Sequence, residues 1–227
     1  MSKTKQKRRG LLGWFVLFAL LGTLAWNHAS LTWPEVVWLA FPIAIMLIRL
    51  PFTVKTKDNE ITVDENSGQE KVLMFLLFLT MAPIPLIYLA VKSLGWDVLG
   101  LADYALPEAL SVVGACLILP FAILFWRSHY DLGKNWSPRL EMRQDHQLVT
   151  SGVYRYVRHP MYSAIWISVI AQPLLIQNMV AGGLVVPVFF AMHMLRIPKE
   201  EQMMLETFGE PYKDMMDRTG RIFPKLY

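Results

Sequence analysis

The sequence predicts an all-α, polytopic transmembrane helical bundle with about six crossings, a polar cytoplasmic insert and a C-terminal surface helix. Hydrophobic residues make up 54% of the 227-residue chain and charged residues only 18%. A soluble domain has about 45–50% apolar and about 25% charged residues. Several uncharged runs also approach or exceed the roughly 20 residues that a helix needs to cross a bilayer. Composition and run length therefore both favour a membrane protein.

The first predicted span runs from Leu11 to about Ser30, after a short tail rich in Lys and Arg. The uncharged stretch 11–33 is longer than the roughly 7–15 apolar residues of a signal-peptide core, so we expect a retained helix. We interpret the basic tail as a topology signal and not as a nucleic-acid-binding arm. Three further spans are predicted at residues 34–50, 72–91 and 109–126, with a kink at Pro83 and Pro85.

Residues 161–195 form the longest stretch without a formal charge, 35 residues in all. A single helix of that length would measure about 52 Å, whereas the hydrocarbon core of a bilayer is only about 30 Å thick. The stretch is therefore predicted to fold as a helical hairpin, although each arm is somewhat short for a full crossing. Polar and glycine residues mark the expected bend: Gln177, Asn178, Gly182 and Gly183.

Basic residues in the loops predict how the chain is oriented. They occur in the N-terminal tail, between the second and third spans, in the segment 127–158 and in the C-terminal tail, whereas the loop 93–108 contains only acidic charges. Basic loops stay in the cytoplasm. Both termini and the polar insert are therefore expected to be cytoplasmic, and in a bacterium the membrane would be the inner one.

Two segments outside the spans carry weaker patterns. For residues 53–70 we favour a solvated loop, but the short alternation around Ile61 and Val63 leaves a strand or hairpin open. Beyond Arg196, apolar residues recur at helical spacing, which predicts an amphipathic surface helix interrupted by a turn at Gly209 and Pro211. The single cysteine, Cys116, excludes an intrachain disulfide.

The segment 128–159 is too polar to lie in lipid, and it lacks the motifs of several enzyme classes. It contains no Gly-x-Gly-x-x-Gly or Walker-type loop, which argues against a Rossmann or P-loop nucleotide site. It also contains no Gly-x-Ser-x-Gly elbow. Its histidines lack metal-ligand spacing with Cys or Glu, so no metal site is predicted.

Two polar clusters bracket the long uncharged run. In the first, Pro160 suits the first turn of a helix, so His159 could be a plain N-cap and Arg158 an interface anchor. In the second, Arg196 and Glu200 are four residues apart and share a helix face, which on a surface is only a weak ion pair. If the hairpin brings both clusters to one membrane face, they suit a ligand that carries both charges.

Five motifs in the C-terminal half resemble the isoprenylcysteine carboxyl methyltransferase family and its relatives, the phospholipid methyltransferases. They occur in order between residues 132 and 212 at spacings like those of that family. The motifs are Leu132-Gly133-x-x-Trp136-Ser137, His146-x-Leu148-Val149-Thr150-x-Gly152-x-Tyr154, Arg158-His159-Pro160-x-Tyr162, Arg196-x-x-x-Glu200-Glu201 and Phe208-Gly209-x-x-Tyr212.

The resemblance implies an S-adenosylmethionine-dependent methyltransferase, with N-terminal transmembrane helices at 1–127 and a catalytic region at 128–227. It assigns the acceptor substrate to Arg196, and it makes Arg196 and Glu200 the catalytic residues. The chain departs from the family at Arg139, where glutamine is expected, and at Ser163, where glycine is common. The cofactor-binding residues that it implies are His146, Gln147, Leu148, Val149, Tyr154, His159, Pro160, Met161, Tyr162 and Glu200.

The acceptor implied by the resemblance is a lipophilic small molecule or a lipidated substrate, such as a prenylcysteine-like carboxylate. Membrane lipid is the other expected partner, with no nucleic acid and no obligate protein partner. Two alternative enzymes remain open: a nicotinamide-dependent membrane reductase of the sterol-reductase type, and a phospholipid or thiol methyltransferase. A non-enzymatic scaffold or small transporter is disfavoured because the spans carry few charges.

Overall fold

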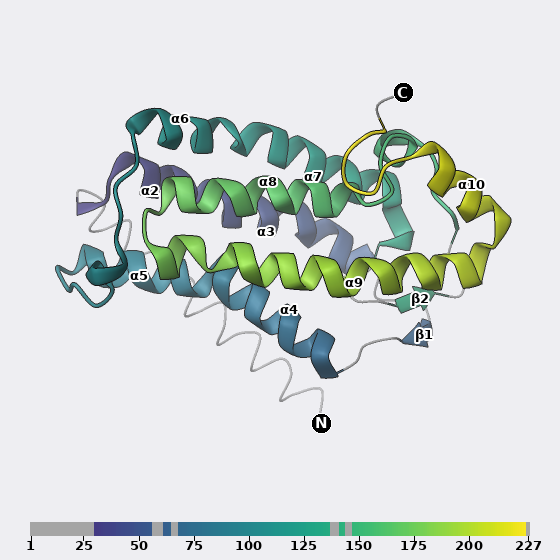
Figure 1. Ribbon diagram of the computed structural model, residues 1–227, viewed down its shortest axis with the longest axis horizontal. Helices are drawn as coiled ribbons and strands as arrows, with labels where there is room; N and C mark the ends of the chain where they lie inside the picture. The colour runs from purple at the N-terminus through teal and green to yellow at the C-terminus, as the bar shows by residue number, and fades with distance from the viewer. Residues whose placement is uncertain (1–29, 56–60, 65–67, 137–140, 144–146, 226–227) are drawn as a thin grey trace.

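The computed structural model describes residues 30–55, 61–64, 68–136, 141–143 and 147–225 (Figure 1). It is mostly helical, with the long helices side by side along the longest axis, as the fold prediction required. The first predicted span, apart from Ser30, lies outside the described residues, so the count of six crossings stays a prediction. Four described stretches are long and apolar enough to cross a membrane: Trp33–Phe52, Gly68–Ser93, Glu108–Leu132 and Met179–Phe208.

Three of these stretches consist of two helices joined at a one-residue interruption. The pairs are α2 (Trp33–Trp38) with α3 (Ala40–Lys55), α4 (Gly68–Met81) with α5 (Pro83–Ser93), and α6 (Glu108–Cys116) with α7 (Ile118–Leu132). Each first helix ends four residues before a proline, namely Pro42, Pro85 or Pro120. A proline cannot donate to the carbonyl four residues earlier and its ring clashes there. The kink predicted at Pro83 and Pro85 is confirmed, and the same cause acts twice more.

The predicted helical hairpin is confirmed, with its bend at the predicted residues. α8 (Pro160–Leu175) and α9 (Val185–Phe208) lie side by side, joined by a turn and the short π-helix η5 (Met179–Gly183) (Figure 1). The Asn178 side chain accepts hydrogen bonds from the backbone of Val180 and Ala181 at 3.0 and 2.8 Å. A Cβ on Gly182 would lie 1.9 Å from the Ile176 carbonyl oxygen, so the bend requires glycine there.

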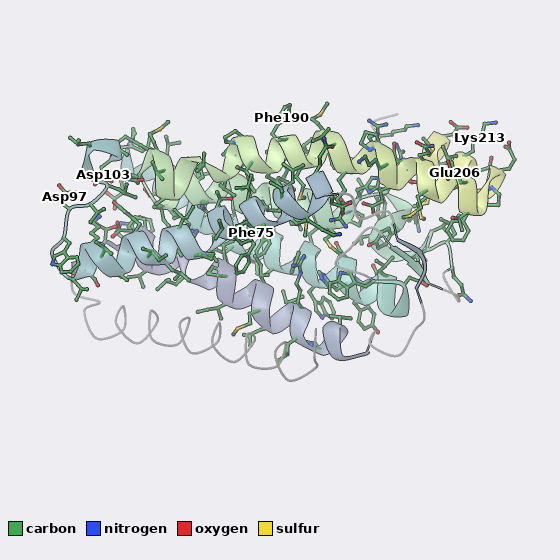
Figure 2. All side chains as sticks on the ribbon, turned by 90° about the horizontal axis from the view of Figure 1, so that it is seen from below. Phe75, Asp97, Asp103, Phe190, Glu206 and Lys213 are labelled. Carbon is green, nitrogen blue, oxygen red and sulfur yellow. The ribbon has the colours of Figure 1, made fainter. Side chains whose placement is uncertain are left out.

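The core is built around α8, which is shorter than each of the four apolar stretches that are long enough to cross a membrane. Its small residues Ala164 and Ala171 are fully buried, which lets neighbouring helices approach closely. Phe121 of α7 and Phe189 of α9 are also fully buried and belong to the same cluster. Apolar side chains such as Phe75 and Phe190 are instead exposed on the outside of the bundle (Figure 2). An apolar exterior of this kind is suited to lipid.

The loop before α4 contains a strand, so our preference for a plain solvated loop at 53–70 was wrong over residues 61–64. β1 (Ile61–Asp64) pairs antiparallel with β2 (Glu141–Arg143) of the polar insert. The alternation around Ile61 and Val63 does mark a strand. A four-residue strand needs a partner for its backbone groups, however, and this partner is about eighty residues away in the sequence. The pairing brings this loop and the insert to the same end of the bundle (Figure 1).

The C-terminal region begins as an extension of α9 and not as a separate surface helix. α9 continues without interruption past Arg196 and Pro198 to Phe208. Gly209, with φ of 58°, ends it, and α10 (Glu210–Arg218) follows with Pro211 in its first turn. The predicted turn is therefore confirmed. Three short 3-10 helices complete the described chain: η2 (Gly100–Ala102), η3 (Gly133–Asn135) and η4 (Gly152–Arg155).

Candidate active site

The two polar clusters are in contact at one end of the hairpin, where α8 begins. The Tyr162 hydroxyl donates a hydrogen bond to Glu200 Oε2 at 2.9 Å. His159 Nδ1 lies 3.7 Å from Glu200 Oε1, and the rings of His159 and Tyr162 meet edge to face at 5.6 Å. Residues that are 38 apart in the sequence are thus joined by the hairpin. We refer to this end of the bundle as the site end.

His159 occupies the N-cap position of α8, but its ring makes no capping hydrogen bond. The ring lies between two carboxylates, with Nδ1 facing Glu200 and Nε2 at 3.4 Å from Glu201 Oε1. Arg158 is not an exposed interface anchor, because its buried guanidinium pairs with Glu201 at 3.0 Å. The plain structural interpretation of these two residues is therefore incomplete.

Glu200 and Glu201 are neighbours in the sequence but differ in environment. The side chain of Glu201 is only 5% exposed and pairs with Arg158 at 3.0 Å and Arg221 at 2.7 Å. The side chain of Glu200 is 29% exposed, and its arginine neighbour, Arg196, is 3.9 Å away. Glu201 is therefore neutralised by close partners, whereas Glu200 keeps an accessible carboxylate.

Arg196 connects α9 to α4. Its side chain is 10% exposed, and its guanidinium lies 3.2 Å from Glu70 Oε1 and donates to the sulfur of Met74 at 3.2 Å. The sequence predicted the proximity of Arg196 and Glu200 but missed Glu70, which is the closer carboxylate. Its only signal was an acidic residue just before the third predicted span. Buried ion pairs of this kind need good geometry to offset the cost of desolvation.

An apolar and aromatic cluster adjoins the charged groups. Tyr154, Tyr212 and Met215 are buried in it, with Leu148 and Val149 packed against them. Burial raises the pKa of the Tyr154 phenol well above its usual value, and the charge of Glu200 raises it further. Burial also raises the pKa of Tyr212, with Glu201 as the next cause. Both phenols therefore stay neutral, and the two glutamates lie within electrostatic range of the cluster.

The segment that carries Tyr154 is fixed by Asp131, a residue outside the predicted site. Asp131 Oδ2 accepts a hydrogen bond from the backbone of Val153 at 2.9 Å, and Oδ1 pairs with Arg127 at 2.9 Å. A Cβ on Gly152 would lie 2.1 Å from Asp131 Oδ2, and Gly152 has φ of 61°. The glycine of the second motif is therefore explained by a close approach to this carboxylate.

Four other residues predicted to bind the cofactor are Pro160, Met161, Gln147 and His146. Pro160 is buried in the first turn of α8, and Met161 is partly buried against the core. Gln147 is exposed, and its backbone N–H donates to Asn135 Oδ1 at 3.1 Å. His146 lies outside the described residues. The structure thus groups His159, Tyr162, Arg196 and Glu200, with Leu148, Val149 and Tyr154 beside them.

Residues 112–206 match the model of the isoprenylcysteine carboxyl methyltransferase (ICMT) family. The resemblance drawn from the sequence motifs is confirmed. The matched stretch contains four of the five motifs and all of the predicted site residues. Four stretches of the described chain that are long and apolar enough to cross a membrane also indicate an integral membrane protein. The match favours the methyltransferase interpretation over a nicotinamide-dependent reductase.

Curated relatives are named after the activity that also gives the family its name. The protein-S-isoprenylcysteine O-methyltransferase of Schizosaccharomyces pombe is 37% identical over 83 residues, or 37% of this chain and 35% of that protein. Protein-S-isoprenylcysteine O-methyltransferase B of Arabidopsis thaliana is 32% identical over 114 residues, or 48% of this chain and 56% of that protein. The matches thus span about a third to just over half of these relatives.

A solved structure is also similar to the chain. It is the eukaryotic intramembrane Ras methyltransferase ICMT, with 25% sequence identity. The alignment covers 80% of this chain and 60% of that one, with a TM-score of 0.45.

Proposed function

We propose that the protein is an integral-membrane methyltransferase that uses S-adenosylmethionine to methylate a carboxylate on a lipophilic or lipidated acceptor. One observation carries the proposal. Tyr162 and His159, from the motif at the start of α8, both contact Glu200, from the motif on α9. In the ICMT family these motifs serve the cofactor, and here they form one constellation beside an arginine.

The residues at this place fit S-adenosylmethionine. The accessible Glu200 carboxylate and the neighbouring Tyr162 ring suit a ligand with a positively charged amine and sulfonium. The cluster of Leu148, Val149 and Tyr154 offers an apolar and aromatic surface of the kind that an adenine ring prefers. When bound, the cofactor supplies a methyl group already activated on sulfur, so a carboxylate acceptor needs no general base.

The residues of the chain then have to bind the acceptor, orient it towards the methyl group and exclude water. Arg196 can hold an acceptor carboxylate through two parallel N–H···O bonds. Glu70 fixes its guanidinium from α4, and the Tyr162 hydroxyl orients Glu200. Placing two reactants in line accounts for up to roughly 7–11 kcal/mol of barrier reduction. This is enough for positioning to be the main catalytic contribution of the protein.

The distribution of charge supports a cytoplasmic site. Basic side chains such as Arg155 and Lys199 are exposed near the site end, whereas the loop at the opposite end carries Asp97 and Asp103. Loops rich in Lys and Arg remain in the cytoplasm. We therefore place the site and both termini on the cytoplasmic side, in the inner membrane if the source is a bacterium. The acceptor would reach the site from the membrane.

Calorimetry with S-adenosylhomocysteine tests the cofactor site directly. The wild-type protein should bind, and His159→Ala or Glu200→Ala should abolish the binding heat. Glu206→Ala is the matched control, because Glu206 lies on the same helix but is exposed farther along it (Figure 2). Unchanged binding in both site variants would remove the proposed site.

The acceptor is identified by mass spectrometry with a labelled methyl donor. Purified protein is incubated with prenylcysteine analogues, phospholipids and small thiols in separate reactions. Label on the carboxylate of a lipophilic cysteine supports the proposal. Label only on a phospholipid amine or a thiol favours the alternative methyltransferases.

A further inference from the structure

The C-terminal residues 219–222, which we call the C-terminal strap, lie along the segment that leads into α8. Val157 and Gly220 form a parallel bridge. The backbone N–H of Arg158 donates to the Gly220 carbonyl, and that of His159 donates to the Arg221 carbonyl, both at 2.9 Å. The strap therefore holds the backbone of His159 from about sixty residues away in the sequence.

A side-chain anchor lies at each end of the strap. At one end, Arg158 Nη1 donates to the carbonyl of Thr219 and to that of Met216, the latter at 3.1 Å. At the other, Ser163 Oγ donates to the Ile222 carbonyl at 2.6 Å. The strap is thus attached at both ends to side chains that flank His159 in the sequence.

The charge of Arg221 completes the attachment. Its Nε and Nη2 lie 2.9 and 2.7 Å from the same oxygen of Glu201, Oε2. The other oxygen of Glu201 faces Arg158 at 3.0 Å and His159 Nε2 at 3.4 Å. One buried carboxylate thus links α9, the segment before α8 and the C-terminal strap. Removing Arg221 would leave Glu201 with a single arginine partner.

We propose that Arg221 is a positioning residue, which holds Glu201 so that the other face of His159 is presented to Glu200 in the cofactor site. This inference rests on the proposed function and deepens it. Arg221 touches neither Glu200 nor Tyr162 in the described contacts, so it acts through Glu201 and His159. The C-terminal strap then helps to position the residues of the cofactor site.

The test compares Arg221→Ala with Arg218→Ala, which removes an exposed arginine from the end of α10 and leaves Glu201 untouched. Arg221→Ala should weaken S-adenosylhomocysteine binding by up to about tenfold, because the lost charge-assisted hydrogen bond is worth about that factor and acts on the cofactor site only through Glu201 and His159. The control should bind like the wild type. Ser163→Ala, which removes only the hydroxyl anchor, should have a smaller effect in the same direction.

Two further measurements separate positioning from folding. The side chain of Arg221 is 54% exposed, so added methylguanidinium should reach Glu201 and restore much of the lost affinity. Arg221→Lys, which keeps the charge, should restore part of it. The Michaelis constant for the cofactor should rise while that for the acceptor stays near the wild-type value, whereas a general loss of folding lowers the maximal rate and changes neither Michaelis constant.

The outcomes distinguish this inference from the proposed function. Wild-type protein that fails to bind S-adenosylhomocysteine contradicts the proposed function. Wild-type binding with equal binding by Arg221→Ala contradicts only the role of Arg221. Hydrogen exchange of the Arg158 and His159 amides gives a readout that needs no cofactor: exchange in Arg221→Ala as slow as in the wild type also contradicts that role.

Discussion

The hairpin of α8 and α9 is held by charges at the site end and by neutral amides at its turn. At the turn, the Asn178 side chain bonds Leu99 and Asp103 at 2.9 and 2.6 Å, and the Gln172 amide bonds two backbone carbonyls. At the site end, arginine–carboxylate pairs make the corresponding connections. Both ends are well connected, but among the described residues the site end has buried arginines paired with buried carboxylates directly beside the partly exposed carboxylate of Glu200.

A surface cavity does not by itself show which end of the bundle carries the functional site. A cavity of about 420 Å³ lies toward the turn end, between α5 and the following loop, lined in part by Tyr88 and Trp96. Two of its polar groups already have partners in the protein. Lys92 pairs with Glu35 at 2.5 Å, and Tyr88 donates to Asp103 at 2.8 Å. The accessible charge of Glu200 is therefore a better guide to chemistry than volume.

The largest effect is expected from Arg196→Ala at the site end. The substitution leaves Glu70 and Glu200 without their shared cation, and losing one partner of a buried pair costs about 3–5 kcal/mol. Methyl transfer should be lost together with thermal stability. Arg196→Lys should recover most of the stability but little of the activity, because lysine cannot form two parallel bonds to a carboxylate. Full activity in the lysine variant would contradict the role given to Arg196.

A sharper test separates the two adjacent glutamates. Glu201→Gln removes the charge that Arg158 and Arg221 share, so the free energy of unfolding should fall by roughly 1.5–3 kcal/mol. Glu200→Gln should leave stability nearly unchanged and weaken S-adenosylhomocysteine binding. Thermal unfolding and calorimetry on both variants measure the two quantities. Equal loss of stability in both variants would contradict the assignment of Glu201 as a structural carboxylate and Glu200 as a ligand-facing one.

The smallest effect at the site is expected from Asn178→Ala at the turn. The variant loses several hydrogen bonds and should lower the free energy of unfolding by about 1–3 kcal/mol. Binding of S-adenosylhomocysteine in the folded fraction should match the wild type, because the turn end carries no site residue. A binding defect larger than that of Glu201→Gln would show that the two ends are coupled.

Local signals in the sequence were enough for the helices and for part of the site. Uncharged runs located the described spans, and the polar and glycine residues near Asn178 located the bend. The four-residue spacing of Arg196 and Glu200 placed both on one helix face, and the need for a hairpin placed that face beside His159. These features depend only on residues close in the chain or on the thickness of a bilayer.

Contacts between distant segments could not be predicted in the same way. Glu70 reaches Arg196 only because α4 packs beside α9, and no spacing rule connects residues 126 apart. Two other contacts also join segments that are far apart in the sequence: the pairing of β1 with β2 and the ion pair of Arg221 with Glu201. Asp131 was overlooked because its role is to accept a backbone hydrogen bond from Val153, which leaves no pattern in the side chains.

The ion pair between Glu70 and Arg196 affects whether the C-terminal half of the chain can function as a separate fragment. The segment 128–227 carries the motifs, yet the closer counter-ion of its central arginine, Arg196, is Glu70, from the other side of that boundary. A fragment that starts at Ser128 would leave this buried guanidinium with only the more distant Glu200 as a described carboxylate partner. Such a truncated piece should not work as a stand-alone enzyme, whereas two co-expressed halves that reassemble in the bilayer would regain the missing carboxylate.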